Sequence, residues 1–511
     1  MATPLEPKKI NVGTYGLMRQ ASVDDTLMPE GVVTEVQNFH FDRLGVATTR
    51  LGIKTLASTS VIQFNNANPC LGLHNMLGTM LLAAFYKSDV TRTVLYFHNN
   101  DNNNLWVQNA NVTAIGGSAK IRFVDFADRT ILLTGTADSL LVLRSLSASP
   151  TTGTGNPINL TQFMDGGGTA DRKTASFGEV YKSRVYLAGD ASGLGISNYT
   201  GKPSRLYISS VIDTSGNISW NPTVDYVDIN PGDGEDITGL KRYSLELDIF
   251  KPNYIYRFRT SGLDPDPLIK IGTRSHESIV EGKTGLYFHH DTGFYQYSGG
   301  YPKEISRAIV DFVDSIPVSQ RDDIIGWKDN DHIYWSLGNL TIKEVKESVL
   351  WRNVVVRYTE STDLWTIFSY KQDIRRGVPY VTKTSSSISV GLDNGMVALF
   401  NEGNTDIDEP IKYRLVTKWY DWGNILERKT IQELGAVAEK SREAQLMYQT
   451  DENLEWQGIG QLKKLVNIFN KQNIEFNRVR FKITGTNKLE QMTFQGLLIA
   501  KGQNQGMVYA N

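Results

Sequence analysis

The stretch GLYFHHDTGFYQYSGG, residues 285–300, joins two short aromatic-rich runs through a polar break. The break contains Asp291, Thr292 and Gly293. Asp bonds nearby backbone N–H groups and Gly adopts positive φ angles, so both favour tight turns. Each flanking run has the length of a strand, and its Tyr and Phe side chains suit a pleated, half-buried surface. The stretch therefore predicts a β-hairpin that turns at Asp291–Gly293.

The same plan of strand, polar turn and strand recurs at intervals of ~40–60 residues, which is typical of propeller blades. Examples are RTILLTGTADSLLVLR at 129–144, LELDIFKPNYIYRF at 245–258 and SISVGLDNGMVALF at 387–400. The repeats are degenerate and carry no WD or kelch signature. The rhythm predicts a β-propeller, with an irregular pile of β-sandwiches as the alternative.

The composition agrees with many short strands. Hydrophobic residues make up 40% of the 511 residues and charged residues 21%, which is enough apolar material for a packed core. There are 45 Gly, 23 Tyr and 20 Phe but only 16 Pro, a balance that favours strands and tight turns over long helices.

We predict an all-β fold: a β-propeller platform with a small C-terminal β-sandwich and an extended N-terminal arm. The predicted parts are an arm at 1–30, a propeller at 31–410 with a loop insertion at about 148–176 and a helix at about 303–316, a sandwich at 411–503 and a tail at 504–511. The arm is polar and lacks alternation, so we expect a partner to order it. The tail is also polar and is expected to be extended.

The predicted helix is based on one apolar stripe. Ile305, Ile309, Phe312 and Ile316 fall three to four residues apart, between prolines at 302 and 317. This spacing places them on one helical face, which we expect to pack against the β-core.

Charge and cysteine content limit the classes of function. The formal net charge is −2, so no global basic field attracts nucleic acid, and any such contact has to be local. The single cysteine, Cys70, excludes an internal disulfide and a multi-cysteine zinc site, and we expect it to be a buried apolar residue. The start of the chain lacks a signal-peptide pattern, and no apolar run approaches the ~18 residues that span a bilayer. We expect folding in a reducing cytoplasm.

Acidic residues are paired at Asp233–Asp236 (DGED) and in DPDP at Asp264–Pro267. Glycosidases need two carboxylates and calcium needs several oxygen ligands. Neither stretch has the D-x-D-x-D-G spacing of a calcium loop, and Asp is common in turns. A structural turn is therefore the favoured interpretation, with a bound cation or catalysis as alternatives.

His289, His290 and Asp291 form the densest candidate metal cluster. Neighbouring strand residues point to opposite faces, so the two histidines cannot readily share one ion. Sialidase-type Asp-boxes are approached at 213–220 and 360–367, but both stretches fail the spacing.

No other motif points to catalysis. Gly193–Arg205 is glycine-rich and basic but lacks the order of a phosphate loop, and no G-x-S-x-G elbow occurs. Trp419, Tyr420 and Trp422 have side chains suited to stacking on sugars or bases, although aromatic strands more often belong to a β-core. We predict no catalytic, cofactor-binding or metal-binding residues, no cofactor, and a protein that is not an enzyme.

Several segments, in order along the chain, resemble the head-to-tail connector proteins of short-tailed bacteriophages, known as tail hub, nozzle or packaged-DNA stabilisation proteins. The resembling segments are N-x-x-F-D at Asn38–Asp42, followed by Gly45 and R-x-G at Arg50–Gly52; then Tyr181–Pro222, Asp228–Phe258, Gly272–Ser306 and Gly391–Gly423. Most of residues 31–430 is covered in scattered blocks. The arm at 1–30 and the loop at 148–176 have no counterpart in the family.

The resemblance implies a structural virion protein without catalysis. It implies a ring homo-oligomer, usually a hexamer, around a channel for genomic DNA below the portal, without sequence-specific binding. Other tail or adaptor proteins would be its partners, and its location would be the virion tail after assembly in the bacterial cytoplasm. The alternative is a receptor- or glycan-binding propeller, a tail adhesin, which needs an exposed aromatic pocket. A glycoside-acting enzyme would need two carboxylates ~5–10 Å apart across a cleft.

Overall fold

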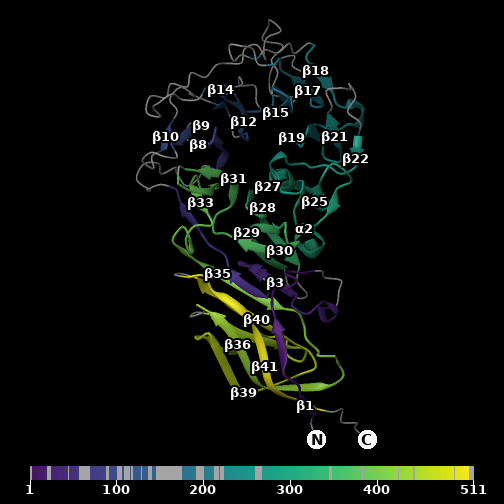
Figure 1. The fold of residues 1–511 in the computed structure, drawn as a ribbon, viewed down its shortest axis with the longest axis vertical. Helices are drawn as coiled ribbons and strands as arrows, with labels where there is room; N and C mark the ends of the chain where they lie inside the picture. Colours follow the sequence, from purple (N-terminus) through teal and green to yellow (C-terminus); the bar gives the residue numbers. More distant parts are fainter. Residues whose placement is uncertain are drawn as a thin grey trace.

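A computed structural model describes most of the chain (Figure 1). The described residues are 3–19, 25–43, 45–56, 69–87, 91–99, 106–108, 115–116, 119–127, 129–135, 141–144, 175–190, 201–211, 218, 224–258, 267–343, 348–382, 384–423, 425–440, 444–487 and 490–505. Small sheets surround one axis in the upper part of Figure 1, and a two-sheet body lies below them. The structure confirms the prediction of an all-β fold with a propeller and a sandwich.

In the described part of the chain, six separate sheets and four strands of a larger one form seven blades. The first three blades contain β7 (Cys70–Met76), β8 (Met80–Lys87), β9 (Arg92–Asn99), β10 (Trp106–Gln108) and β11 (Ile115–Gly116); β12 (Arg122–Phe126), β13 (Arg129–Leu133) and β14 (Leu141–Arg144); and β15 (Phe177–Tyr181), β16 (Arg184–Ala188), β17 (Arg205–Ile208) and β18 (Tyr226–Asp228). Neighbouring strands within each blade are antiparallel.

Blades four to seven follow in chain order. They contain β19 (Gly239–Tyr243), β20 (Glu246–Phe250), β21 (Ile255–Phe258) and β22 (Pro267–Ile269); β23 (Val280–Glu281), β24 (Leu286–His290), β25 (Gly293–Tyr297) and β26 (Lys303–Glu304); β27 (Ile325–Asp329), β28 (His332–Lys343), β29 (Ser348–Thr359) and β30 (Leu364–Ser369); and β31 (Ile374–Val381), β32 (Ser386–Leu392), β33 (Val397–Phe400) and β6 (Ile53–Thr55). The hairpin predicted at 285–300 is confirmed as β24–β25, where His290 pairs with Gly293.

Strand β6 closes the ring of blades. It precedes the first blade in sequence but pairs antiparallel with β33 of the last blade, with Ile53 opposite Phe400. The seventh blade is therefore built from both ends of the propeller sequence. At the adjoining inner strands, Arg376 of β31 donates a hydrogen bond from Nη2 to the Leu71 carbonyl of β7 at 2.7 Å.

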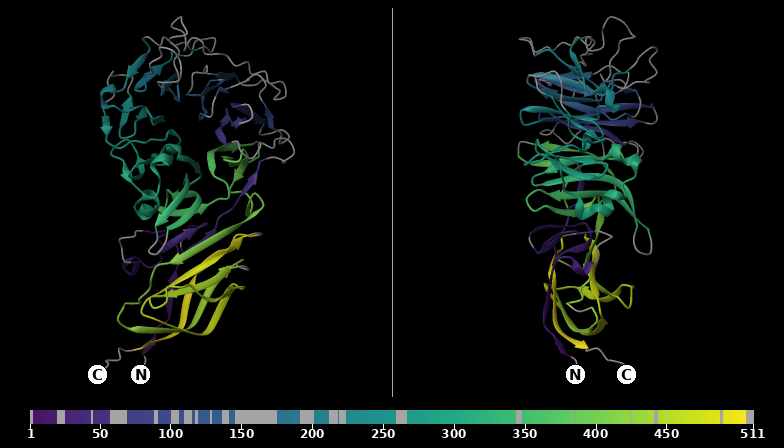
Figure 2. Two further views of the ribbon diagram at one scale, coloured as in Figure 1. Left: turned by 180° about the vertical axis from the view of Figure 1, so that it is seen from behind. Right: turned by 90° about the vertical axis from the view of Figure 1, so that its right-hand side faces the viewer.

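The lower body is a sandwich of two sheets. The first sheet runs β39-β36-β41-β5-β4, with β1 and β2 also paired to β41; the second runs β35-β40-β37-β38, with β3 paired to β35. The bounds are β1 (Thr3–Leu5), β2 (Lys8–Asn11), β3 (Val33–Gln37), β4 (Phe39–Arg43), β5 (Val46–Thr49), β34 (Thr405–Asp406), β35 (Glu409–Thr417), β36 (Arg428–Glu439), β37 (Ala444–Thr450), β38 (Gln457–Leu462), β39 (Val466–Phe476), β40 (Val479–Asn487) and β41 (Thr493–Gln505). Both views in Figure 2 show the sandwich as a separate body below the ring.

The start of the propeller differs from the predicted boundary at residue 31. Strands β3 to β5 belong to the sandwich, because β3 pairs with β35 and β5 with β41. Asn38, at φ 64°, separates β3 from β4, so the alternating segment VVTEVQNFHF changes sheet in its middle. Alternation in sequence identifies strands but does not show which sheet they join.

The N-terminal arm is extended, as predicted, but its partner lies within the same chain. Lys8–Asn11 pair with β41, and the side chains of Ile10 and Val12 are fully buried in the sandwich core. The expectation that a partner protein orders the arm is wrong for these strands. At the other end, β41 continues to Gln505, so the predicted tail begins later than residue 504; residues 506–511 lie outside the description.

The helix predicted at 303–316 is shorter. Lys303 and Glu304 form β26 against β25, and the Ile305 N–H donates to the Phe294 carbonyl at 2.9 Å, which keeps this part extended. The described helical segments are η1 (Asp25–Leu27), η4 (Pro231–Asp233), η5 (His276–Ser278), η6 (Arg307–Ile309), α2 (Val310–Asp314) and η7 (Val318–Asp323). The predicted apolar stripe is confirmed, since Ile309, Phe312 and Ile316 are buried. The loop at 148–176 lies outside the described residues except for its last two positions.

One hydrophobic core joins the two bodies. Trp335 and Trp365 of the sixth blade, Phe312 of α2, and Leu434 and Phe481 of the sandwich belong to the same buried cluster. Burial of side chains of this size contributes roughly 1.5–3 kcal/mol each. The propeller and the sandwich therefore do not pack as independent cores.

Candidate functional site at the propeller axis

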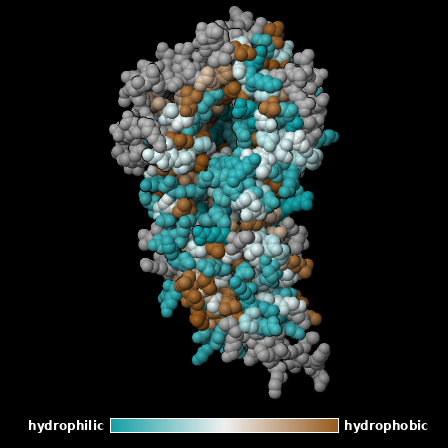
Figure 3. All heavy atoms as spheres, viewed as in Figure 1, coloured by the Kyte–Doolittle hydropathy of each residue, from teal (hydrophilic) through white to brown (hydrophobic). Residues whose placement is uncertain are grey.

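A cavity of about 550 Å³ lies where the inner strands of the blades meet. Figure 3 shows the molecule hollowed at the centre of the ring. The charged and histidine side chains in its lining are His74, Arg122, Asp125, Glu179, Lys241, Arg242, His276, Glu277 and Arg376. They come from β7, β12, β15, β19, η5 and β31, so separate segments of the repeat converge on one site.

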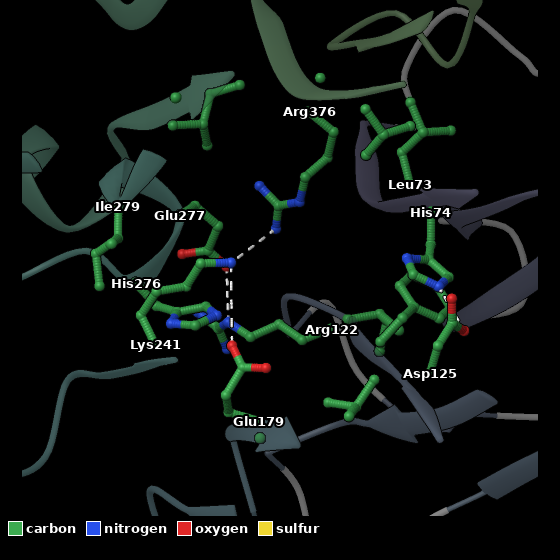
Figure 4. Close-up of a pocket in the computed structure, with 18 of the residues that line it drawn as sticks. Leu73, His74, Arg122, Asp125, Glu179, Lys241, His276, Glu277, Ile279 and Arg376 are labelled. Atoms are coloured by element: carbon green, nitrogen blue, oxygen red, sulfur yellow. Dashed lines mark hydrogen bonds and ion pairs between the residues drawn. The ribbon is translucent and has the colours of Figure 1, made fainter. Parts of the chain in front are cut away.

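Glu277 is the centre of this charge cluster (Figure 4). Its Oε1 lies 2.7 Å from Arg122 Nε and 3.8 Å from Arg376 Nη2. Burial alone would raise the pKa of Glu277, but the charges of the two arginines outweigh burial and hold its pKa well below the ordinary value. The carboxylate of η5 is therefore ionised and connects the second blade with the seventh.

Two further pairs bridge neighbouring blades. Lys241 Nζ of β19 lies 4.0 Å from Glu179 Oε2 of β15. His74 Nε2 of β7 lies 2.9 Å from Asp125 Oδ1 of β12. Burial raises the pKa of Asp125, but the hydrogen bond and charge of His74 outweigh it, so the net shift is downward.

The histidine beside Glu277 is held neutral. Burial lowers the pKa of His276 to about 3, and its buried Nδ1 has no hydrogen-bond partner among the described residues. A neutral imidazole adds no positive charge to the two arginines nearby. The cluster thus combines fixed ion pairs with an uncharged ring.

The arrangement suits cross-linking of blades better than acid–base chemistry. A carboxyl that acts as a general acid needs a raised pKa, whereas the pKa values of Asp125 and Glu277 are lowered. A cavity of about 550 Å³ has the size of a small-molecule site.

Two carboxyls outside the axial cluster, Asp248 and Asp373, have pKa values that burial raises. Burial raises the pKa of Asp248 in β20 to about 6, despite the charge of Arg257. The Tyr297 hydroxyl lies 3.3 Å from Asp248 Oδ1, which fastens the fourth blade to the fifth. Because Asp248 is 0% exposed, no substrate reaches it in this structure.

The acidic turn at Asp233–Asp236 has a structural role. Lys251 Nζ donates to both oxygens of Asp233, at 2.7 and 2.8 Å, and the Tyr256 hydroxyl donates to Asp233 Oδ2 at 2.7 Å. Lys251 is fully buried, so this pair ties the turn before the fourth blade to the middle of that blade. The second acidic stretch, 264–267, lies outside the described residues except for its last proline.

The two adjacent histidines lie against different aromatic residues. His289 packs edge-on against Phe294, and His290 packs edge-on against Tyr295. Asp291 pairs with Arg274 at 2.9 Å and with Arg321 at 3.3 Å. Within the described ranges, no group of three or more His, Cys, Asp or Glu is arranged to hold a metal ion.

The remaining sequence candidates lie in the core, in a turn or on the sandwich surface, or fall outside the description. Cys70 is buried, as predicted, and burial raises the pKa of its thiol to about 12. Tyr420 is buried and stacks on Trp422 at 6.1 Å between ring centroids. Glu360–Ile367 crosses the β29–β30 turn. The Asp-box stretch at 213–220 is described only at residue 218, and the glycine-rich stretch only from residue 201.

Sequence reasoning missed the charged junction between the two bodies. Arg50 is 1% exposed and uses its guanidinium to contact Asn38, Asp406 and the Ser369 carbonyl. The motif containing Arg50–Gly52 was visible, but its partner Asp406 lies 356 residues away. Without a paired change in related sequences, nothing in one sequence connects the two residues.

The strand order and the closed ring define a seven-bladed β-propeller joined to a β-sandwich. No protein-family model and no curated protein sequence matches the chain. Among the described residues, no helix has the length and apolar character needed to cross a membrane.

Solved structures with some similarity include three domains. The extracellular domain of a putative hybrid two component system from B. thetaiotaomicron has 10% identity and a TM-score of 0.37, with 68% of this chain and 39% of that chain covered. The Pan2 WD40 domain of Neurospora crassa has 8% identity and a TM-score of 0.40, with 70% of this chain and 97% of that chain covered. The AfRom2 CNH domain has 9% identity and a TM-score of 0.39, with 69% of this chain and 100% of that chain covered. This chain thus matches 39% of the first structure's length.

Proposed function

We propose that the chain is a structural subunit of a tailed bacteriophage, a tail hub or nozzle protein that forms part of the DNA-delivery channel below the portal. It acts without catalysis, as one copy in a ring. The proposal starts from the segments that resemble phage hub and nozzle proteins, and it is supported by where those segments meet in the fold.

The carrying observation is the junction around Arg50. Asn38 and Arg50 come from the opening resembling segment and Asp406 from the segment Gly391–Gly423, and Arg50 bonds to both other residues in the buried interior. A third element of the resemblance, the Asp228–Phe258 segment, supplies the buried pair of Asp233 and Lys251. These bonded residues of the resembling segments belong to the rigid framework, as expected of a protein whose work is mechanical.

The geometry of the propeller axis also bears on the proposal. Glu277, Arg122 and Arg376 form ion pairs across the axis. DNA therefore does not pass through a single propeller, and the channel has to form between copies in the ring. We expect its lining to be mostly acidic or uncharged polar, because phosphate binding increases with the number of Lys and Arg side chains presented.

The test uses phage particles made without this protein. We expect them to package DNA but to leak it or fail to deliver it. Electron microscopy of complete particles should show the chain as a ring, with six copies as the expected number. Particles that lack the chain and yet retain and inject DNA normally contradict the proposal. Robust glycan hydrolysis or specific glycan binding by the purified chain would instead favour the enzyme or adhesin alternatives.

A further inference from the structure

The second sandwich sheet carries a row of cations and tryptophans on its outer face. Arg480 and Lys482 are alternate residues near the start of β40, Arg478 immediately precedes that strand, and all three are half-buried. Trp419 follows β35, and Trp456 precedes β38; both are half-buried. The residues between the cations, Val479 and Phe481, are buried in the sandwich core together with Ile483.

The five side chains alternate in space. Arg478 Cζ and Arg480 Cζ lie 5.8 and 4.7 Å from the ring centroid of Trp419. Arg480 Cζ and Lys482 Nζ lie 5.3 and 4.3 Å from the ring centroid of Trp456. We call this order, Arg478–Trp419–Arg480–Trp456–Lys482, the cation ladder.

The ladder is held in place and is crowded with like charge. Gln449 Oε1 accepts a hydrogen bond from Arg480 Nε at 2.6 Å, which fixes the middle guanidinium. Burial lowers the pKa of Lys482, and the positive charges of Arg414 and Arg480 lower it further, against an opposing effect of Glu35. Glu35 itself lies 3.2 Å from Arg414. An added anion would relieve this repulsion.

We propose that the cation ladder binds the phosphate backbone of double-stranded DNA without reading its sequence. Alternate residues of a strand are ~6.6 Å apart, so Arg480 and Lys482, together with Arg478 next to the strand, present a row of charges to a polymer of evenly spaced phosphates. Phosphate contacts position DNA but carry no direct sequence information. The inference stands on the ladder alone and does not rest on the proposed function.

Two observations favour phosphates over other ligands. Trp419 and Trp456 each pack against two cations already, so they are poor stacking surfaces for bases or sugars. A protein partner would need an apolar interface centre. Three exposed apolar side chains of the sandwich lie on the other sheet, Val466 and Ile468 of β39 and Leu498 of β41, whereas Leu454 is a single exposed apolar side chain in the β37–β38 connection.

Weak phosphate binding by the ladder is compatible with movement of the DNA past the protein. Three phosphate contacts give a slope of about −2.7 for the logarithm of affinity against the logarithm of salt concentration. Affinity then falls about 40-fold between 50 and 200 mM NaCl. Binding that is non-specific and depends on salt to this degree allows a protein to slide along DNA.

The test is fluorescence anisotropy of a labelled duplex of arbitrary sequence, titrated with the purified full-length chain between 50 and 200 mM NaCl. We expect the slope above for the unchanged chain. Lys482→Gln should make the slope shallower by about 0.9, because one phosphate contact is lost. Arg480→Gln should do the same, and circular dichroism with thermal unfolding verifies that each variant is folded.

The matched control is Arg428→Gln. Arg428 lies on β36 of the other sheet, is half-exposed, and pairs with Glu452 and Glu475 at 3.1 and 2.9 Å. This variant should bind DNA as the unchanged chain does.

Three results overturn the inference: no binding at 50 mM NaCl, folded variants of Lys482 and Arg480 with an unchanged slope, or polyglutamate competing as well as unlabelled duplex. The last result would indicate that the ladder binds an acidic protein instead of DNA. The assay uses no phage particle, so failure of the hub role would leave this DNA binding intact, and failure here would leave the particle test open.

Discussion

Arg50→Ala should destabilise the chain more than most single changes, because Arg50 holds the junction of propeller and sandwich. Its Nε donates to Asn38 Oδ1 at 2.8 Å, and its two terminal nitrogens reach Asp406 at 2.8 and 2.6 Å. The same nitrogens also donate to the carbonyls of Leu51 and Ser369 at 2.9 and 2.8 Å. All five donors of the guanidinium are thus used.

The magnitude follows from burial. Arg50 and Asp406 are 1% and 5% exposed, so removing the arginine leaves a buried carboxylate without its counter-charge. Breaking a buried pair in this way costs about 3–5 kcal/mol. Replacing both partners by apolar residues of similar volume is often close to neutral. Arg50→Met combined with Asp406→Leu should therefore recover most of the loss.

The assay is urea unfolding followed by circular dichroism. Chains of this size often unfold through intermediates, so the midpoint of the first transition is compared between variants. Arg428→Ala serves as the control, since this half-exposed surface pair should contribute only about 0–1 kcal/mol. A cost below about 1 kcal/mol for Arg50→Ala, or a double variant no more stable than the single one, would refute the reasoning.

Three further changes test other parts of the fold. Phe312→Ala should cost about 3–5 kcal/mol in urea unfolding because the ring is buried against Trp351; a cost below ~1 kcal/mol would show a peripheral helix. Deleting residues 1–12 removes β1, β2 and the buried Ile10, so the truncated chain should begin to unfold at a lower urea concentration, and an unchanged profile would contradict the pairing with β41. Burial lowers the pKa of His289 from 6.5 to about 3, so its contribution to stability is full above pH 6.5 and falls as the unfolded chain takes up the proton. By pH 5 this contribution has fallen by about 2 kcal/mol, so His289→Phe should lose about that much less stability between pH 7 and pH 5 than the unchanged chain, while His276 continues to contribute in both.

Local chemistry predicted the blades well. The turn at Asp291–Gly293 has residue types that dictate a hairpin, and the structure has β24 and β25 there. The stripe through Ile309 and Phe312 also lies where its spacing placed it. In both cases neighbours in sequence carry the whole signal, so one sequence is sufficient.

The errors arose where distant segments decide the structure. Residues 8–11 look polar and unpaired, yet β41 provides their partner from the opposite end of the chain. Lys303 and Glu304 fit a helical pattern, but they pair with β25 and form a strand. The axial cluster has the same origin, because Arg122 and Glu277 meet only once the blades close. Long-range pairing overrides local preference, and a single sequence does not report it.

The position of Arg50 explains why one side chain can couple two bodies. The chain enters the propeller just after Arg50, where Ile53 begins β6, and it leaves the propeller through β34, where Asp406 lies parallel beside Ile53. The entering and leaving segments approach so closely at Gly52 that a Cβ there would lie 1.9 Å from the Thr405 carbonyl oxygen. Two adjacent crossings, joined by an ion pair and lacking room for a side chain, leave little freedom for the sandwich to swing. A force applied to the sandwich is therefore transmitted to β6, the strand that closes the propeller. Arg50, Gly52 and Asp406 thus help to keep the ring of blades closed and also set the orientation of the ring relative to the sandwich.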